Sequence, residues 1–107
     1  MTVFVDNANI PFAGMKMSHM WADTLPELLA MADRIGVHRR WLQEPPRASW
    51  THFDISLGKK ARAIAAGAVQ TDLYAALEHV ARQQCDFAML DRIAALRARK
   101  ETAHAEP

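Results

Sequence analysis

The sequence predicts a small α/β domain in which a short mixed sheet of three to four strands packs with about four helices. Short runs of β-branched and aromatic residues alternate along the chain with segments whose apolar residues recur every three or four positions. The length of 107 residues fits one domain, because a second core would leave each half too short to fold alone. We therefore expect a single α/β domain over residues 1–100 and a frayed tail over residues 101–107.

Two strands are expected near the N-terminus. Val3–Val5 is a β-branched and aromatic run that ends at the turn-forming pair Asp6 and Asn7. Residues 8–14 contain a proline and a glycine, and we expect them to lack regular structure. Alternating side chains over residues 15–21 then predict the second strand.

The clearest predicted element is a helix over Leu25–Ile35. A capping-box pattern begins at Thr24, apolar residues recur at helical spacing, and Gly36 supplies the C-terminal stop. Residues 37–43 alternate and predict a strand. Residues 17–43 would then form a strand–helix–strand crossover, which is expected to be right-handed.

Glu44–Thr51 is expected to be a loop, because it contains two consecutive prolines. An extended segment follows, and a helix is expected to begin near Ser56. The residues expected to face inward from that helix are Leu57, Ala61, Ile64, Ala65 and Ala68. Residues 69–70 predict a very short strand, and residues 72–100 predict two further amphipathic helices interrupted at residues 83–86.

Composition and motifs narrow the functional classes. Thirteen basic and twelve acidic residues give a formal charge of +1, so no overall field draws the protein to nucleic acid or membrane. A single cysteine, Cys85, excludes an internal disulfide and a cysteine zinc cluster and suits the cytoplasm. No apolar run is long enough for a membrane span. The glycine motifs of dehydrogenases and P-loop ATPases are absent, as are the HExxH and GxSxG motifs.

Four ordered stretches carry a family resemblance. They are Val3–Asn7, Met17–Thr24, Ala30–Val37 leading to Arg40–Gln43, and His52–Ser56 with Lys59, Lys60 and Ala66–Ala68. In these stretches, which cover about residues 2–70, the chain resembles the bacterial and phage family DUF4031, a domain of unknown function. The resemblance implies an α/β domain with a set of polar positions and no particular reaction. Asn7 stands where the family pattern usually has a second aspartate, which weakens any proposal that needs paired carboxylates there, and Lys60 stands where arginine is commoner.

Acids and imidazoles that follow predicted strands make up the candidate site. The candidate catalytic residues are Asp6, His19, His52 and Asp54, and Asp6, His52 and Asp54 are also candidate ligands of a divalent metal. Ligands of open α/β sheets bind beyond the carboxyl ends of strands, so we expect these groups to share a pocket there. His52 and Asp54 project the same way from an extended segment. The alternatives are an Asx-turn at Asp6 and Asn7, and a helix-capping role for Asp54 beside a solvated His52.

A local surplus of basic residues over residues 34–62 predicts an anion-binding site. The candidate anion-binding residues are Asn7, Arg40, Gln43, Lys59 and Lys60. The alternative is a solvated charged face. Trp41 and Trp50 flank the proline loop: Trp41 is expected in the core, and Trp50 is expected either to pack or to stack on a ligand.

Three functional hypotheses follow from these features. The first is a small hydrolase or transferase that uses a divalent metal on a phosphate-containing ligand, either a nucleotide or a nucleic-acid end. The second is a non-catalytic nucleotide- or ligand-binding module that uses the same pocket. The third is an accessory protein that acts through protein–protein contacts, in which the helices over residues 72–100 support a homodimer.

Overall fold

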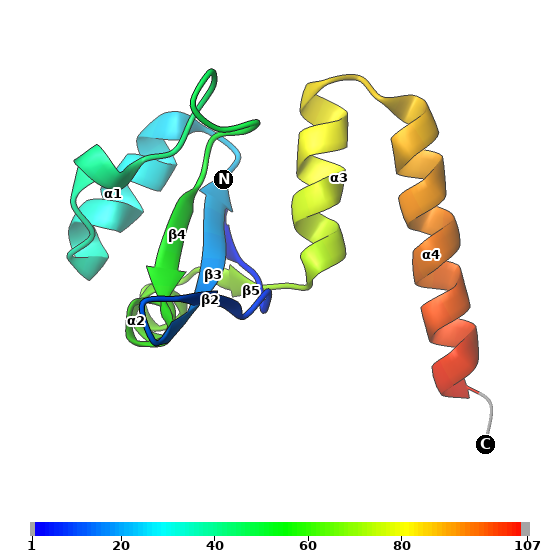
Figure 1. Cartoon of the computed structure of the whole chain (residues 1–107), viewed down its shortest axis with the longest axis horizontal. Coiled ribbons are helices and arrows are strands. Elements are labelled where there is room, and N and C mark those ends of the chain that lie inside the picture. Colours follow the sequence, from blue (N-terminus) through cyan, green and yellow to red (C-terminus); the bar gives the residue numbers. More distant parts are fainter. Residues whose placement is uncertain (1, 106–107) are drawn as a thin grey trace. The chain divides into compact units, whose positions relative to one another are not determined.

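The computed structural model describes residues 2–105, without the side chains of Leu73 and residues 100–105 (Figure 1). In chain order the elements are β1 (Val3–Val5), β2 (Ile10–Phe12), β3 (Met15–Ala22), α1 (Leu25–Ile35), the 3₁₀ turn η1 (Arg39–Trp41), β4 (Phe53–Ser56), α2 (Leu57–Ala65), β5 (Val69–Gln70), α3 (Leu73–Gln83) and α4 (Phe87–Ala105). The chain divides into two compact units, Met1–Leu73 and Tyr74–Pro107. The first unit contains the sheet, α1 and α2.

The sheet is mixed, as predicted, and has five strands among the described residues instead of three to four. Its centre is β3. Met17 pairs with Ile10 of β2 and also with Ser56 of β4. Since a strand has two edges, β2 and β4 lie on opposite edges of β3. β1 pairs antiparallel with the last part of β3, and β5 adds to β1 in the parallel direction.

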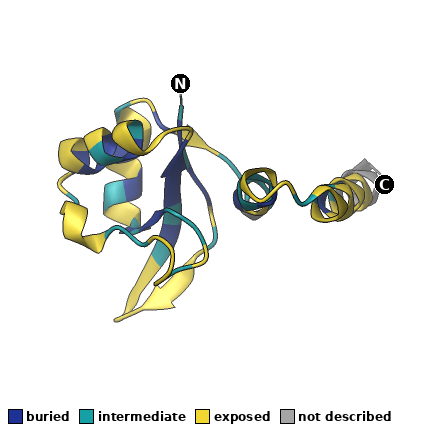
Figure 2. Cartoon of the chain, turned by 90° about the horizontal axis from the view of Figure 1, so that it is seen from above, coloured by how far each residue is buried: buried dark blue, intermediate teal, exposed yellow. Residues whose placement is uncertain are grey.

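The hydrophobic core lies between one face of this sheet and the helices α1 and α2. Val5, Met20 and Phe53 of the strands are fully buried and pack with Leu28 of α1 and Ala63 of α2. The dark blue stripes in Figure 2 show that the buried sides of the strands and of the two helices face each other. Helices therefore cover one sheet face, and the alternate strand residues point to the other.

The helix α1 has the predicted bounds and the predicted stop. Gly36 follows it with φ of 79°, a left-handed conformation that favours glycine. At the N-terminus the Thr24 hydroxyl donates a hydrogen bond to the Glu27 carboxylate at 2.8 Å and does not cap a backbone N–H. Thr24 and Glu27 therefore contact each other side chain to side chain, and the Thr24 hydroxyl does not accept the backbone hydrogen bond of a capping box.

Two expectations about strands are wrong. Ile10–Phe12 forms β2 within the segment expected to be irregular, because Ala13 and Gly14 make a tight positive-φ turn that folds it onto β3. Residues 37–43 are not a strand. The His38 ring accepts a hydrogen bond from the Arg40 N–H at 3.0 Å, and this local bond favours the 3₁₀ turn η1. The predicted crossover over residues 17–43 is therefore absent.

The helix α2 begins where the sequence predicts, but it buries a different face. The Ser56 hydroxyl caps it by accepting a hydrogen bond from the Lys59 N–H. The buried α2 residues are Lys60 and Ala63, while Leu57 is 51% exposed, and of the five residues expected to face inward only Ala68 is buried. Ser56 is both the last residue of β4 and the cap of α2, so no loop separates the two elements. The direction of β4 therefore determines which face of α2 turns to the core, and the apolar residues of α2 do not.

The second unit contains a helical hairpin made of α3 and α4. Gln84–Asp86 separates α3 from α4, close to the predicted interruption, and the Asp86 carboxylate accepts a hydrogen bond from the Met89 N–H. Arg97 of α4 forms an ion pair with Glu78 of α3. The expected tail is helical over residues 101–105, and residues 106–107 lie outside the described residues. The single domain over residues 1–100 and the homodimer stay predictions. Within residues 2–105, no helix has the length and apolar character needed to cross a membrane.

Candidate metal centre

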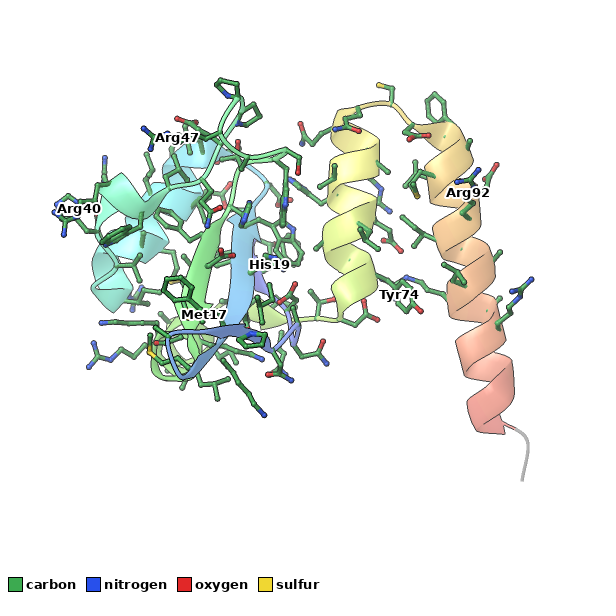
Figure 3. The ribbon with its side chains drawn as sticks, viewed as in Figure 1. Met17, His19, Arg40, Arg47, Tyr74 and Arg92 are labelled. Atoms are coloured by element: carbon green, nitrogen blue, oxygen red, sulfur yellow. The ribbon has the colours of Figure 1, made fainter. Side chains whose placement is uncertain are left out.

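The candidate site lies on the sheet face opposite α1 and α2. Side chains alternate across a strand, so Met20 and Phe53 point into the core while their neighbours His19 and Asp54 point to the other face. His19, labelled on β3 in Figure 3, is the direct register partner of Asp54 on β4. The sequence predicted a site beyond the strand ends. Asp6 does follow the end of β1, whereas Asp54 lies within β4 and His19 lies within β3, inside the predicted strand over residues 15–21.

The Asp6 carboxylate is fully buried and holds His19 in place. Its Oδ2 atom accepts a hydrogen bond from His19 Nδ1 at 2.7 Å. Its Oδ1 atom accepts from the backbone N–H groups of His19 at 2.9 Å and Ala8 at 3.2 Å. Burial alone would raise the pKa of Asp6, but the His19 ring and these N–H groups hold that pKa below its usual value. Asp6 is therefore an anion at neutral pH.

The orientation of His19 follows from this contact. A carboxylate only accepts hydrogen bonds, so the proton of the neutral His19 ring is on Nδ1 and the lone pair is on Nε2. The Nε2 atom lies 3.9 Å from Asp54 Oδ1. The hydrogen bond to Asp6 raises the pKa of His19, and burial opposes that rise.

His52 is oriented in the same manner by a different acceptor. Its Nδ1–H donates to the Trp50 carbonyl oxygen at 3.0 Å, and its Nε2 atom lies 3.5 Å from Asp54 Oδ1. The Trp50 indole stacks on the His52 ring with centroids 4.3 Å apart, and it also contacts the His19 ring edge-on at 5.4 Å. His52 is therefore buried, with one nitrogen fixed and the other directed at Asp54.

The two oxygens of Asp54 have different surroundings. Oδ2 accepts a hydrogen bond from the Gln43 side-chain amide at 2.6 Å. Oδ1 is buried and has no hydrogen-bond partner among the described residues, although both His Nε2 atoms face it. The neighbouring His52, and then Gln43, lower the pKa of Asp54. That effect of His52 requires a protonated ring. When both imidazole rings are neutral, the ionised Oδ1 faces two lone pairs without a donor, which is a costly arrangement that a cation would relieve.

Three ligand atoms therefore converge, one each from His19, His52 and Asp54, and all lie within 4.8 Å of one another. Two imidazoles and one carboxylate are a common donor set for zinc and other divalent transition metals. Histidine ligands usually donate the second ring N–H to a carboxylate or a carbonyl, as His19 does to Asp6 and His52 to Trp50. Asp6 was one of the sequence-based candidate ligands. It instead accepts a hydrogen bond from His19 Nδ1, and His19 joins His52 and Asp54 in the group of potential ligands.

The candidate anion-binding residues are dispersed. Gln43 joins the metal centre through Asp54, and Asn7 is exposed next to Asp6. Arg40 lies on η1. Lys59 and Lys60 lie on α2, which covers the opposite face of the sheet. These lysines therefore do not line the centre formed by the histidines and Asp54.

The sequence left the role of Trp50 open between packing and stacking on a ligand, and it placed His19 among the candidate catalytic residues and outside the candidate metal set of Asp6, His52 and Asp54. Trp50 could have been found from its position two residues before His52 in the same loop. The proximity of His19 to Asp54 depends on the β3–β4 register, since that pairing brings the two side chains together. Trp41, expected in the core, is 60% exposed on η1.

The comparisons with known proteins identify the family. The model of DUF4031, described as a protein of unknown function, matches residues 3–84, which is well over half of the chain. The chain therefore belongs to the DUF4031 family. The match extends beyond residues 2–70 into α3. No curated protein and no solved structure matches the chain.

Proposed function

We propose that this DUF4031 domain binds one divalent transition-metal ion and uses it to hydrolyse or transfer a phosphate-containing substrate, such as a nucleotide or a nucleic-acid end. His19 Nε2, His52 Nε2 and Asp54 Oδ1 would be the ligands. The observation that carries the proposal is the convergence of these three atoms while both Nδ1 atoms are engaged by acceptors. Both rings are thus fixed in the tautomer that metal ligation requires.

The donor set favours zinc, manganese or iron over magnesium, because magnesium prefers oxygen ligands. The carboxylates of Asp54 and Asp6 together balance a charge of +2, which reduces the cost of placing the ion at a half-buried site. Three protein ligands leave a position open for water or substrate, as in catalytic zinc sites. A zinc ion held by these residues would lower the pKa of bound water to about 7 and would polarise a phosphoryl oxygen.

The protein groups around the ligands would have distinct roles. Asp6 positions His19 and keeps its Nε2 lone pair available. Gln43 binds Asp54 Oδ2 and leaves Oδ1 to face the histidines. Trp50 covers the His52 ring and excludes water from one side of the centre. These contacts support a pre-organised site, since each ligand is held by a second group.

Metal binding can be tested by calorimetric titration of chelator-treated protein with Zn²⁺, Mn²⁺ and Mg²⁺. We expect one Zn²⁺ per chain and much weaker binding of Mg²⁺. Asp54→Asn keeps the size of the side chain and removes its charge, so it should weaken Zn²⁺ binding by more than the about 10–100-fold typical of losing an outer partner. The matched control is Asp33→Asn, at an exposed carboxylate paired with Arg39. Zn²⁺ binding that is equal in the two variants, or absent in the unmodified protein, contradicts the proposal.

A non-catalytic binding module is the second candidate function, and Asn7 favours it. This neutral amide stands beside Asp6, where the family pattern usually has a second carboxylate that could hold another ion. Hydrolysis of p-nitrophenyl phosphate and bis(p-nitrophenyl) phosphate separates the two candidates. Metal-dependent turnover that Asp54→Asn abolishes supports the enzyme. Nucleotide-induced thermal stabilisation without any turnover supports the binding module.

A further inference from the structure

A second group of charged residues lies on the helical layer, away from the metal centre. Arg34 occupies the last turn of α1, and Lys59 and Arg62 project from α2 toward the same point. Lys59 Nζ and Arg62 Nη1 lie 3.1 Å and 3.8 Å from where a Cβ on Gly36 would stand. Arg34 and Arg62 also line an open hollow with Ile35, Ala65 and Ala66. Three cationic side chains therefore gather at the C-terminal end of α1.

These cations have no acidic partners in the part of the chain that the structure describes. No ion pair involves Arg34, Lys59 or Arg62 there. Asp33, the acid in the last turn of α1, is already bound by Arg39 through two hydrogen bonds of 2.7 Å and 3.1 Å. The C-terminal end of a helix attracts cations, but it carries only about half a negative charge. The local positive charge therefore exceeds what the helix end neutralises.

An exposed aromatic residue lies on the turn η1 that follows α1. The Arg39–Asp33 pair fixes η1 against the last turn of α1, and η1 carries Arg40 and Trp41. Trp41 is 60% exposed, and the Arg40 guanidinium lies over its ring at 4.9 Å from the centroid. Figure 3 shows Arg40 pointing away from the sheet. Nucleobases stack on exposed tryptophan rings and on arginine planes.

We propose that Arg34, Arg40, Trp41, Lys59 and Arg62, termed here the basic surface, bind single-stranded nucleic acid without strong sequence preference. Arg34, Lys59 and Arg62 would contact backbone phosphates, and Trp41 would stack on a base. A combination of cations with an exposed aromatic ring is typical of single-strand binding, because a duplex keeps its base faces covered. The inference does not rest on the proposed metal chemistry, since none of these residues belongs to the metal centre.

The test is fluorescence anisotropy of a labelled oligothymidylate of about 12 nucleotides, a length within the usual single-strand site size, with the full chain in EDTA. Binding is expected to weaken as salt rises. Three phosphate contacts predict a slope of about −2 for log K against log[salt] on a single strand. Trp41→Ala should weaken binding by about 5- to 150-fold, the loss of one stacked base.

Arg34→Gln with Arg62→Gln should weaken binding and reduce the salt slope by about 1.4. The matched control is Arg92→Gln on α4, an exposed arginine outside the basic surface that appears in Figure 3. This control should bind as the unmodified protein does. The proposal is overturned by an absence of binding at low salt, by an equal loss in Arg92→Gln, or by tighter binding of a duplex. Equal competition by polyglutamate would also overturn it, because the surface would then recognise negative charge alone.

Discussion

The two faces of the sheet come from the same strands but are held by different interactions. On the face covered by α1 and α2, Met20 and Phe53 are buried among apolar side chains. On the other face, their chain neighbours His19 and Asp54 are fixed by directed contacts with Asp6 and Gln43. Because strand side chains alternate, each strand supplies both faces. A single short strand can therefore contribute to the core and to the candidate site.

The difference between the faces predicts different responses to mutation. Apolar burial has no preferred direction, so its loss lowers the free energy of unfolding without requiring any change in ligand geometry. The hydrogen bond that His19 Nδ1–H donates to Asp6 has a fixed direction, so its loss changes the tautomer and the position of the His19 ring. Mutations on the core face should therefore lower stability more than metal affinity, and mutations on the site face should lower metal affinity more than stability.

The largest expected effect is on the helix-covered face. Phe53→Ala should lower the free energy of unfolding by about 3–5 kcal/mol, because it removes a fully buried ring from the core. Urea unfolding measures this loss. The matched control is Phe12→Ala in β2, where the ring is 64% exposed and the change should stay within about 0.5 kcal/mol. Similar losses in both variants would contradict the division of the sheet into a core face and a site face.

The next effect is on the site face, which carries His19 and Asp54. Asp6→Asn should weaken Zn²⁺ binding by about 10–100-fold, because the amide no longer fixes the Nδ1–H tautomer of His19. Calorimetric titration measures this change, and Asp33→Asn serves again as the control. Unchanged Zn²⁺ affinity in Asp6→Asn would show that Asp6 has no positioning role.

Local patterns in the sequence predicted the elements that local interactions determine. Gly36 marks the end of α1 because a positive φ is required there, and Ser56 marks the start of α2 because its hydroxyl caps that helix. β2 was missed because its proline and the following Ala13–Gly14 turn look like a loop when the partner strand is unknown. The rotation of α2 was missed because Ser56 and β4 determine it and the small residue Ala63 packs inward.

The candidate site was predictable in its members more than in its geometry. Spacing of two along an extended segment correctly placed His52 and Asp54 side by side. The buried pair of Asp6 and His19 depends on the antiparallel pairing of β1 with β3, and no sequence spacing encodes that pairing. The β3–β4 register, which is also non-local, brings His19 rather than Asp6 next to Asp54 in the candidate metal centre.

The pH dependence of stability of the metal-free protein should reflect Asp6 and His19 on the site face. The pKa of Asp6 is lowered on folding, so its contribution is present above its unfolded value of about 3.9 and is lost as pH falls through the folded pKa. The pKa of His19 is raised, so its contribution is complete below its unfolded value of about 6.5 and is lost as pH rises through the folded pKa. Stability in EDTA should therefore be greatest between about pH 4 and 6.5.

Urea unfolding across this pH range tests the assignment. Asp6→Asn should flatten the maximum, because the hydrogen bond to Asp6 is the main cause of the His19 shift. The Phe53→Ala variant should keep the shape of the curve at a lower free energy, since no titrating group changes. A maximum that persists in Asp6→Asn would assign the pH dependence to other groups.

The smallest expected effect compares two serines on neighbouring strands. The Ser18 hydroxyl is buried on the core side of β3 and has no hydrogen-bond partner among the described residues, so Ser18→Ala should be neutral or stabilising by up to about 1 kcal/mol. Ser56→Ala removes the cap of α2 and should cost about 1 kcal/mol. Serine-to-alanine substitution should thus have opposite effects at the two positions. The Ser18 hydroxyl is buried without a described hydrogen-bond partner, whereas the Ser56 hydroxyl accepts a hydrogen bond from the Lys59 N–H. A clear loss of stability in Ser18→Ala would mean that the core face contains a polar contact of its own.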